Sequence, residues 1–275
     1  MDHFRYVFGD HQLSYSHDLE SCPDLTPHTT HMHTHMELLF FVSGKAEYRV
    51  EGAAYTLEPG DILIMRMAEA HHLLLNPNEP YERFVFHFVP ELLKESLNGR
   101  LLAPFLDRPL GQLNRYSASE LPADFIRQSM DFLFQRKDAQ NRMRTLSYLL
   151  PVLQLIYDAW TDKQPHLQQD ATYSLPRKLV AFVNEHLFEL RSLSQLEDAF
   201  FLHQSRISRI FREFTGSSVW QYVQTKRLFA ARDLMQSGVL PGKASVDCGY
   251  GDYSTFYRAY KKQFGCRPQE DFRRI

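Results

Sequence analysis

Three histidines and one glutamate near the N-terminus have a spacing that suits a binding site. His31, His33, His35 and Glu37 occupy alternate positions. Alternate side chains of a β-strand point to one face, so all four would line a single surface. Imidazole and carboxylate groups bind Zn, Mn, Fe or Ni, and they also hydrogen-bond polar small molecules. The segment therefore predicts a ligand-binding or metal-binding surface on one strand.

Two segments near the C-terminus predict a different chemistry, contact with nucleic acid. In residues 204–214 an apolar stripe of Ile207, Ile210, Phe211 and Phe214 would face inward. The side chains left outward on this segment are Ser205, Arg206, Ser208, Arg209 and Arg212. Residues 252–264 repeat the pattern, with Tyr253, Ser254, Thr255, Tyr257, Arg258 and Lys261 outward. Outward arginines and hydroxyls are typical of a helix that enters the major groove.

The segments around these two rows predict a pair of helix-turn-helix units. In the first, a short helix over 193–200 is followed by a turn and the helix over 204–214, and Gly216 suits the helix end. Ser192 and Gln195 are expected to form a capping box before the short helix. A long helix over 218–236 then leads to the second unit, 242–264. A further helix is expected over 176–190.

The N-terminal half reads as short strands followed by helices. The expected strands are 36–42, 46–50, 55–57, 62–65 and 84–89, with Gly and Pro turn signals between most of them. Such strands suggest a barrel or sandwich. Helical periodicity follows over 119–136 and 139–160, and the polar stretch 161–174 contains Pro165.

We therefore expect a two-domain α+β protein. Residues 1–160 would form a β-barrel with two added helices, and residues 161–174 a linker. Residues 175–275 would form an all-α domain with two helix-turn-helix motifs.

The charge is divided unequally between the two halves. The chain carries a net charge of -2, but residues 175–275 carry +6 and residues 1–174 carry -8. A basic domain favours a polyanionic partner. The start of the chain lacks a secretory signal, no apolar run is long enough to span a membrane, and the cysteines form no C-x-x-C pair. We expect a cytoplasmic protein.

Residues 175–275 resemble the DNA-binding domain of the AraC family, the arabinose-regulator type of bacterial activator. The matching stretches are LEDAFFLHQSRISRIFREFTG (196–216), RLFAARDLM (227–235) and ASVDCGYGDYSTFYRAYKKQFGCRP (244–268). Glu197 and the pair Ala244-Ser245 depart from the family pattern on supporting helices.

This resemblance implies roles for individual side chains. Those that would face bases are Ser205, Ser208 and Arg209 on the first helix, and Ser254, Thr255, Tyr257 and Arg258 on the second. Those that would meet phosphates are Arg206, Arg212, Lys261 and Lys262. The family also implies RNA polymerase as a partner.

Residues 28–90 resemble the cupin-like sensor domain of the same family. His31, His33, Glu37 and Gly44 match the first cupin motif, and 59–61 with His71 are similar to the second. The expected N-terminal fold is therefore a cupin-like β-barrel.

In metal-binding cupins the equivalent residues hold a divalent ion. The resemblance thus implies His31, His33, Glu37 and His71 as ligands of Zn, Mn, Fe or Ni. The same four side chains can instead orient an effector without any metal. His28 and His72 are expected at the surface.

Together these features predict a sequence-specific DNA-binding transcription regulator controlled by a small-molecule effector, for which family analogy suggests a sugar. Helices 119–136 and 139–160 would either form a homodimer interface or cover the barrel. The alternative is a cupin-type metal-dependent enzyme with an accessory DNA-binding domain. No acid–base or nucleophile constellation is recognisable outside the His/Glu cluster, so we expect no enzyme. A DNA architectural protein without an effector is a third reading.

Overall fold

The computed structural model describes residues 2–8, 12–21, 30–76, 78–93, 99–134, 141–163 and 175–272. The chain divides into two compact units, Met1–Thr172 (unit 1) and Tyr173–Ile275 (unit 2). No described helix is both long enough and apolar enough to cross a membrane.

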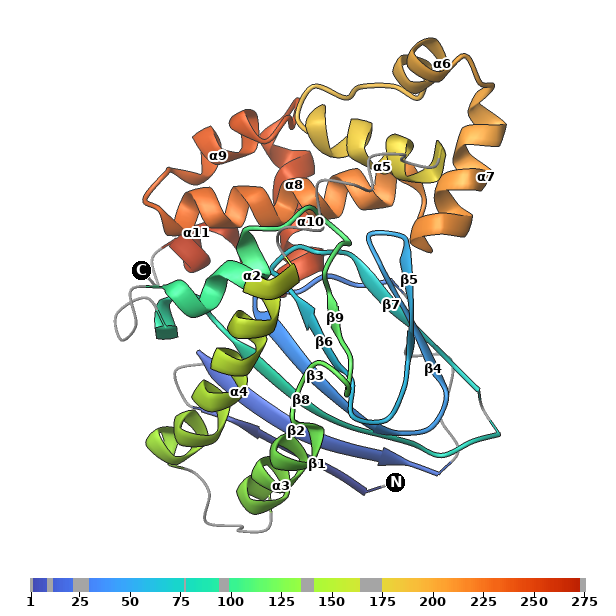
Figure 1. Ribbon diagram of the computed structural model, residues 1–275. Helices are drawn as coiled ribbons and strands as arrows, with labels where there is room; N and C mark the ends of the chain where they lie inside the picture. Colours follow the sequence, from blue (N-terminus) through green and yellow to red (C-terminus); the bar gives the residue numbers. More distant parts are fainter. Residues whose placement is uncertain are drawn as a thin grey trace. The chain divides into compact units, whose positions relative to one another are not determined.

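Unit 1 is built on two antiparallel sheets (Figure 1). The larger sheet contains, in spatial order, β1 (Asp2–Val7), β2 (Leu13–Glu20), β8 (Tyr81–Phe88), β3 (Met36–Ser43), β6 (Ile62–Met65) and β9 (Arg115–Tyr116). The smaller sheet contains β5 (Ala53–Leu57), β4 (Ala46–Val50) and β7 (His71–Leu75). The described strands thus form two sheets rather than one closed barrel. Strands β1, β2, β7 and β9 were not expected from the sequence.

The central strand β3 has no solvent-facing side. Its alternate residues Met36, Leu38 and Phe40 belong to one buried apolar cluster, and Leu39 and Phe41 belong to another. The first cluster continues into helical residues such as Ile126 and Leu149, and the second fills the space between the two sheets. An unbroken run of apolar residues is what a strand buried on both faces requires.

Helices complete unit 1. They are a short 3-10 turn Arg100–Leu102, α2 (Ala103–Leu106), α3 (Ala123–Phe134) and α4 (Arg142–Lys163). Helices α3 and α4 occupy the regions where the sequence predicts helices 119–136 and 139–160. Because α4 continues to Lys163, residues 161–163 are helical and do not begin the linker as expected. The remaining linker residues, 164–174, lie outside the described residues.

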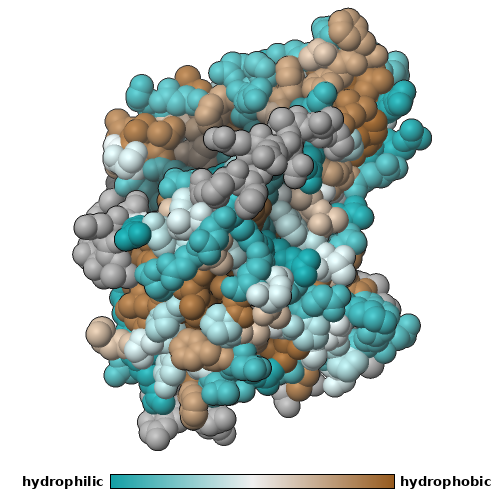
Figure 2. Space-filling model, in the orientation of Figure 1, coloured by the Kyte–Doolittle hydropathy of each residue, from teal (hydrophilic) through white to brown (hydrophobic). Residues whose placement is uncertain are grey.

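Unit 2 is entirely helical. Its helices are α5 (Leu175–Glu185), α6 (Ser194–Phe200), α7 (Gln204–Thr215), α8 (Val219–Gln236), α9 (Pro241–Asp247), α10 (Tyr253–Phe264) and α11 (Pro268–Phe272). In Figure 1, α6 and α7 lie toward one end of α8, and α9 and α11 toward the other. On the face seen in Figure 2, hydrophobic side chains reach the surface over α6 and α7.

Local sequence signals set the helix ends in unit 2. Ser218 and Gln221 form a reciprocal capping box at the start of α8, and the Asp252 side chain accepts a hydrogen bond from the Thr255 amide at the start of α10. Gly216 ends α7 with φ 74°, a conformation that favours glycine.

Only one half of the capping box expected at Ser192 and Gln195 is formed. Helix α6 begins at Ser194 without a side-chain cap, because the Ser192 hydroxyl is bonded to that of Ser194. The Gln195 side chain still accepts hydrogen bonds from the amides of Arg191 and Ser192.

Candidate effector site and nucleic-acid interface

Three imidazole rings converge on one buried carboxylate in unit 1. Oε2 of Glu37 lies 2.6 Å from Nε2 of His33, 3.3 Å from Nε2 of His87 and 3.5 Å from Nε2 of His71. Glu37 is only 4% exposed. Ligand atoms of His33, Glu37 and His87 all lie within 4.8 Å of one another, close enough to share a metal ion.

Strand pairing brings these four residues together. Glu37 on β3 is paired directly with His87 on β8, so both side chains point to the same side of the sheet. His71 begins β7 in the other sheet, and His33 lies in the segment that leads into β3. Residues from both sheets therefore face one point in the interior.

Backbone carbonyls determine how two of these rings are protonated. Nδ1 of His33 lies 2.8 Å from the His35 carbonyl oxygen, and Nδ1 of His71 lies 2.8 Å from that of Glu69. A carbonyl only accepts, so each Nδ1 carries a proton, and the Nε2 of each ring becomes available to a metal ion when the ring is neutral. Among the described residues, the buried Nε2 of His71 has no hydrogen-bond partner.

Burial and the imidazole rings act in opposite directions on the Glu37 carboxyl. Burial raises its pKa, but the close rings of His33, His71 and His87 hold the pKa well below its usual range. Burial lowers the pKa of the His33 ring, whereas at His71 the effect of burial is outweighed by the Glu37 carboxylate, which raises the pKa of that ring. An ionised carboxylate and neutral imidazoles are the protonation states that bind a metal ion.

The cluster borders a cavity of about 330 Å³ inside unit 1. Its lining is mostly polar and includes His31, Ser16, Asp18, Tyr48 and Arg83. Arg83 donates hydrogen bonds to the Asp18 carboxylate (3.1 Å) and the Tyr48 hydroxyl (2.8 Å). A cavity of this size with converging polar groups suits a small hydrophilic ligand.

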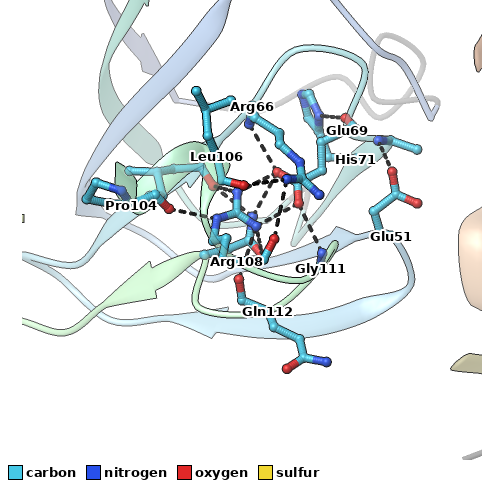
Figure 3. Close-up of polar contacts among 12 residues, drawn as sticks. Glu51, Arg66, Glu69, His71, Pro104, Leu106, Arg108, Gly111 and Gln112 are labelled. Atoms are coloured by element: carbon cyan, nitrogen blue, oxygen red, sulfur yellow. Dashed lines mark hydrogen bonds and ion pairs between the residues drawn. The ribbon is translucent and has the colours of Figure 1, made fainter. Parts of the chain in front are cut away.

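A fully buried ion pair lies directly behind His71 (Figure 3). Glu69 and Arg108 have no exposed side-chain surface, and Arg108 reaches the two carboxylate oxygens at 2.7 and 2.6 Å. The Glu69 carboxylate also accepts hydrogen bonds from the Gly111 amide and the Asn114 side chain. Since the Glu69 carbonyl receives the His71 Nδ1–H, this network holds the His71 ring in place.

The structure brings together only part of the histidine set expected from the sequence. His33, Glu37 and His71 meet as predicted, although the residues whose ligand atoms lie close enough to share a metal ion are His33, Glu37 and His87. The His31 side chain is exposed and lies at the cavity lining, and His87 joins the cluster in its place. His87 was missed, although Arg83, Val85 and His87 alternate with the phenylalanines of β8 and so share the face of the strand that lines the cavity.

The two remaining histidines expected at the surface have different outcomes. His72 is buried at 8% exposure, beside Arg49 on the paired strand β4 and 3.4 Å from the Thr30 hydroxyl. His28 lies outside the described residues.

In unit 2 most of the expected DNA-contacting side chains are solvent-exposed. The exposed ones are Ser205, Arg206, Arg209, Arg212, Ser254, Thr255, Arg258 and Lys261. Ser208, Tyr253 and Tyr257 are half-buried. On the opposite face Ile207, Phe211, Phe256 and Tyr260 are fully buried, while Ile210, Phe214 and Phe264 are only partly covered.

One arginine of α8 ties the two helix-turn-helix units to each other. Arg227 is 8% exposed and donates to the carbonyls of Leu187 and Leu190 near the first unit, and to that of Gly249 in the turn of the second. Three carbonyls held by one guanidinium fix the connection between α5 and α6 to the turn of the second motif. Arg227 begins the stretch RLFAARDLM that carries part of the sequence resemblance.

Two helix-turn-helix motifs on a shared helix, linked to a unit with a polar cavity, define a ligand-responsive DNA-binding regulator. A family model described as an AraC-like ligand binding domain matches residues 19–153, and a model described as a helix-turn-helix domain matches residues 196–274. The chain belongs to the AraC family of transcription regulators. The two-domain fold predicted from the sequence is confirmed.

Curated relatives agree with this assignment. The chain is 22% identical to the HTH-type transcriptional activator RhaS of Escherichia fergusonii over 251 residues, which cover 87% of this chain and 86% of the relative. It is 24% identical to the arabinose operon regulatory protein of Salmonella typhimurium over 238 residues, which cover 83% and 80%. The probable transcriptional regulator LumQ of Photobacterium leiognathi is 30% identical over 88 residues, only 32% and 36%.

A solved structure that aligns with nearly the whole chain is more distant in sequence. ToxT of Vibrio cholerae O395 aligns over 95% of this chain and 97% of its own with 10% identity and a TM-score of 0.38. That score is too low for a comparison of the two binding sites.

Proposed function

We propose that unit 1 binds a small polar effector in the cavity beside Glu37, and that a divalent metal ion held by His33, Glu37, His71 and His87 forms one wall of that site. The observation behind this proposal is the meeting of three Nε2 atoms at one carboxylate oxygen. A divalent cation would bind the Nε2 lone pairs that these rings present once they lose their Nε2 protons, and it would balance the charge of the Glu37 carboxylate. His31 then lines the site without ligating.

The choice of metal follows from the donor set. Three imidazoles and one carboxylate suit Zn, Mn, Fe or Ni. When bound, such an ion supplies a positive charge that can orient an oxygen ligand. The Glu69 carbonyl and the His35 carbonyl would hold the ligand rings in position.

Metal analysis of the purified full chain tests this site. We expect about one equivalent of ion in the wild type and in His31→Ala, and a strong loss in His87→Ala and His33→Ala. His31→Ala is the matched control because its ring lies beside His71 but outside the ligand group. An ion content that is absent in the wild type, or equal in all four proteins, contradicts the ligand assignment but leaves metal-free effector binding open.

We also propose the division of DNA contacts within unit 2. Ser205, Ser208 and Arg209 on α7, with Ser254, Thr255, Tyr257 and Arg258 on α10, would meet base edges. Tyr253 would support the second row, and Arg206, Arg212, Lys261 and Lys262 would meet phosphates. The exposed positions of the arginines support these roles.

Selection of bound DNA from a random pool tests these contacts. Arg209→Ala or Arg258→Ala should abolish the sequence preference of a folded protein, since an arginine bound to guanine contributes about 1–3 kcal/mol of discrimination. Arg206→Ala should weaken binding equally for all sequences and lower the salt dependence. Retained preference in both of the first two variants would refute the assignment.

The effector must bind one arrangement of the protein better than another in order to regulate it. We propose a sugar or a similar polyhydroxy compound, because the cavity lining is polar. A metabolite panel added to the DNA-binding assay, with Arg83→Gln as a cavity variant, identifies the compound.

We further propose a homodimer through α3 and α4, and contact with RNA polymerase by analogy to the family. Phe125, Phe132 and Met143 are exposed on these two helices, at 49%, 58% and 74%. Sedimentation equilibrium of the wild type and of Phe132→Ser measures the association. The competing reading, a cupin-type enzyme, predicts turnover of the effector by the full chain, which we do not expect.

A further inference from the structure

A phenylalanine stands almost fully in solvent at the turn between α6 and α7. Phe201 is 92% exposed, more than any other large hydrophobic side chain in the described residues. A single exposed apolar side chain is common, but one with nearly its whole ring in water gains nothing from folding.

The backbone of Phe201 is also unfavourable. Its φ of 53° and ψ of 38° place it in the left-handed region, which bulky residues avoid. The equivalent turn of the second helix-turn-helix motif has Gly249 with φ 80°, where no side chain opposes the conformation. The two helix-turn-helix motifs thus reach the same left-handed backbone conformation with different residues. The first motif uses a phenylalanine, for which this conformation is strained.

Neighbouring contacts hold the turn in this shape independently of the ring. The Gln204 side chain donates to the Glu197 carboxylate at 2.8 Å across the turn. His203 caps α7 by accepting from the Ser205 amide, and Leu196 and Ile207 are fully buried beneath. The turn therefore does not depend on the Phe201 side chain for its stability.

We propose that Phe201 is an apolar DNA contact at the edge of the major groove, packing against a thymine methyl group or a deoxyribose beside the bases that α7 reads. This rests on the DNA binding of unit 2. Phe201 lies two residues before the cap of α7, and the first residues of a recognition helix lie closest to the base edges. Phenylalanine is among the side chains that contact thymine methyl groups.

The charge around the turn fits this partner. Arg206 and Arg209 follow within the first two turns of α7 and are exposed. They would supply the attraction to phosphate, while the ring would add a contact that carries no charge.

Replacing Phe201 should raise the stability of the protein and lower its affinity for DNA. In the full chain without DNA, Phe201→Gly and Phe201→Asn should raise the melting temperature, because both residues accept a positive φ. The same variants should bind the selected DNA about five- to tenfold more weakly. Phe201→Leu, which keeps both the apolar side chain and the strain, should stay within about twofold of the wild type. These affinity changes follow from losing one apolar contact.

Salt dependence separates this contact from the charged ones. The slope of log affinity against log salt should be unchanged in Phe201→Asn, but should fall by about 1 in Arg206→Ala. Leu240→Asn is the matched control, since Leu240 is 64% exposed but precedes α9 of the second helix-turn-helix motif. Its affinity should equal that of the wild type.

Thymine-to-uracil exchange at each position of the site distinguishes the two apolar surfaces of DNA. If one uracil weakens the wild type but not Phe201→Asn, the contact is a methyl group; if no uracil matters while Phe201→Asn is weaker, it is a sugar. Unchanged affinity in Phe201→Gly and Phe201→Asn, with Arg209→Ala impaired, overturns this proposal alone. A wild type that binds no DNA overturns the proposed function as well.

Discussion

The buried pair of Glu69 and Arg108 predicts a specific response of unit 1 to acid. Burial raises the pKa of the Glu69 carboxyl, but the Arg108 guanidinium and the amides of Gly111 and Arg66 lower it to about 2 from an ordinary 4.5. The folded pKa is thus below the unfolded one, and the resulting stability is present above pH 4.5 and lost as the pH falls toward 2. This difference corresponds to roughly 3 kcal/mol, of which about 2 kcal/mol is lost by about pH 3.

The variant Glu69→Gln isolates this contribution. It keeps the shape of the side chain but leaves the Arg108 charge buried without its partner, so near neutral pH unfolding should become easier by about 3–5 kcal/mol. The variant has no carboxylate to protonate at this position. The stability difference between wild type and variant should therefore shrink by about 2 kcal/mol between neutral pH and about pH 3.

Urea unfolding followed by tryptophan fluorescence measures this difference. The chain has two tryptophans, Trp160 in α4 of unit 1 and Trp220 in α8 of unit 2. In a Trp220→Phe background the signal reports unit 1 of the full chain. A stability difference between the wild type and Glu69→Gln that stays constant over this pH range would refute the reasoning, because it would mean that the folded and unfolded states do not differ in the pKa of the Glu69 carboxyl.

Three further outcomes are expected in unit 2. Arg227→Met should destabilise this unit by about 2–4 kcal/mol, because it leaves carbonyls of two segments without their donor, as measured by urea unfolding in a Trp160→Phe background. Ser218→Ala should cost about 1 kcal/mol in the same assay by removing the cap of α8. Burial raises the pKa of the Cys248 thiol to about 12, so iodoacetamide should label Cys266 well before Cys248 in the native chain, and peptide mass spectrometry that finds equal rates would contradict the burial.

Local patterns in the sequence were sufficient for the helical unit. Apolar periodicity, together with Gly216, Ser218 and Asp252, predicts the boundaries of α7, α8 and α10 to within a residue or two, because caps and stripes are local. The failure at Ser192 is also local: its hydroxyl has a competing partner in Ser194.

The cavity required information that no local pattern contains. His87 lies far from Glu37 along the chain and meets it only through the register between β8 and β3. Arg108 follows a short helix and contacts Glu69, which is 39 residues away along the chain, only in the folded protein. Strands β1 and β2 were missed because their polar residues, such as Ser16 and Asp18, line the cavity and break the expected apolar pattern.

The absence of a solvent face on β3 has a mechanical consequence that extends to β8. Successive residues of β8 belong to opposite layers: Phe86 sits in the apolar layer that includes Val152 and Ile156 of α4, while His87 points to Glu37. Close-packed interiors resist compression and pass displacement onward. A ligand that displaced the His87 ring would therefore act on a strand whose opposite face belongs to the same apolar layer as α4, so that binding in the cavity could be transmitted to this helix.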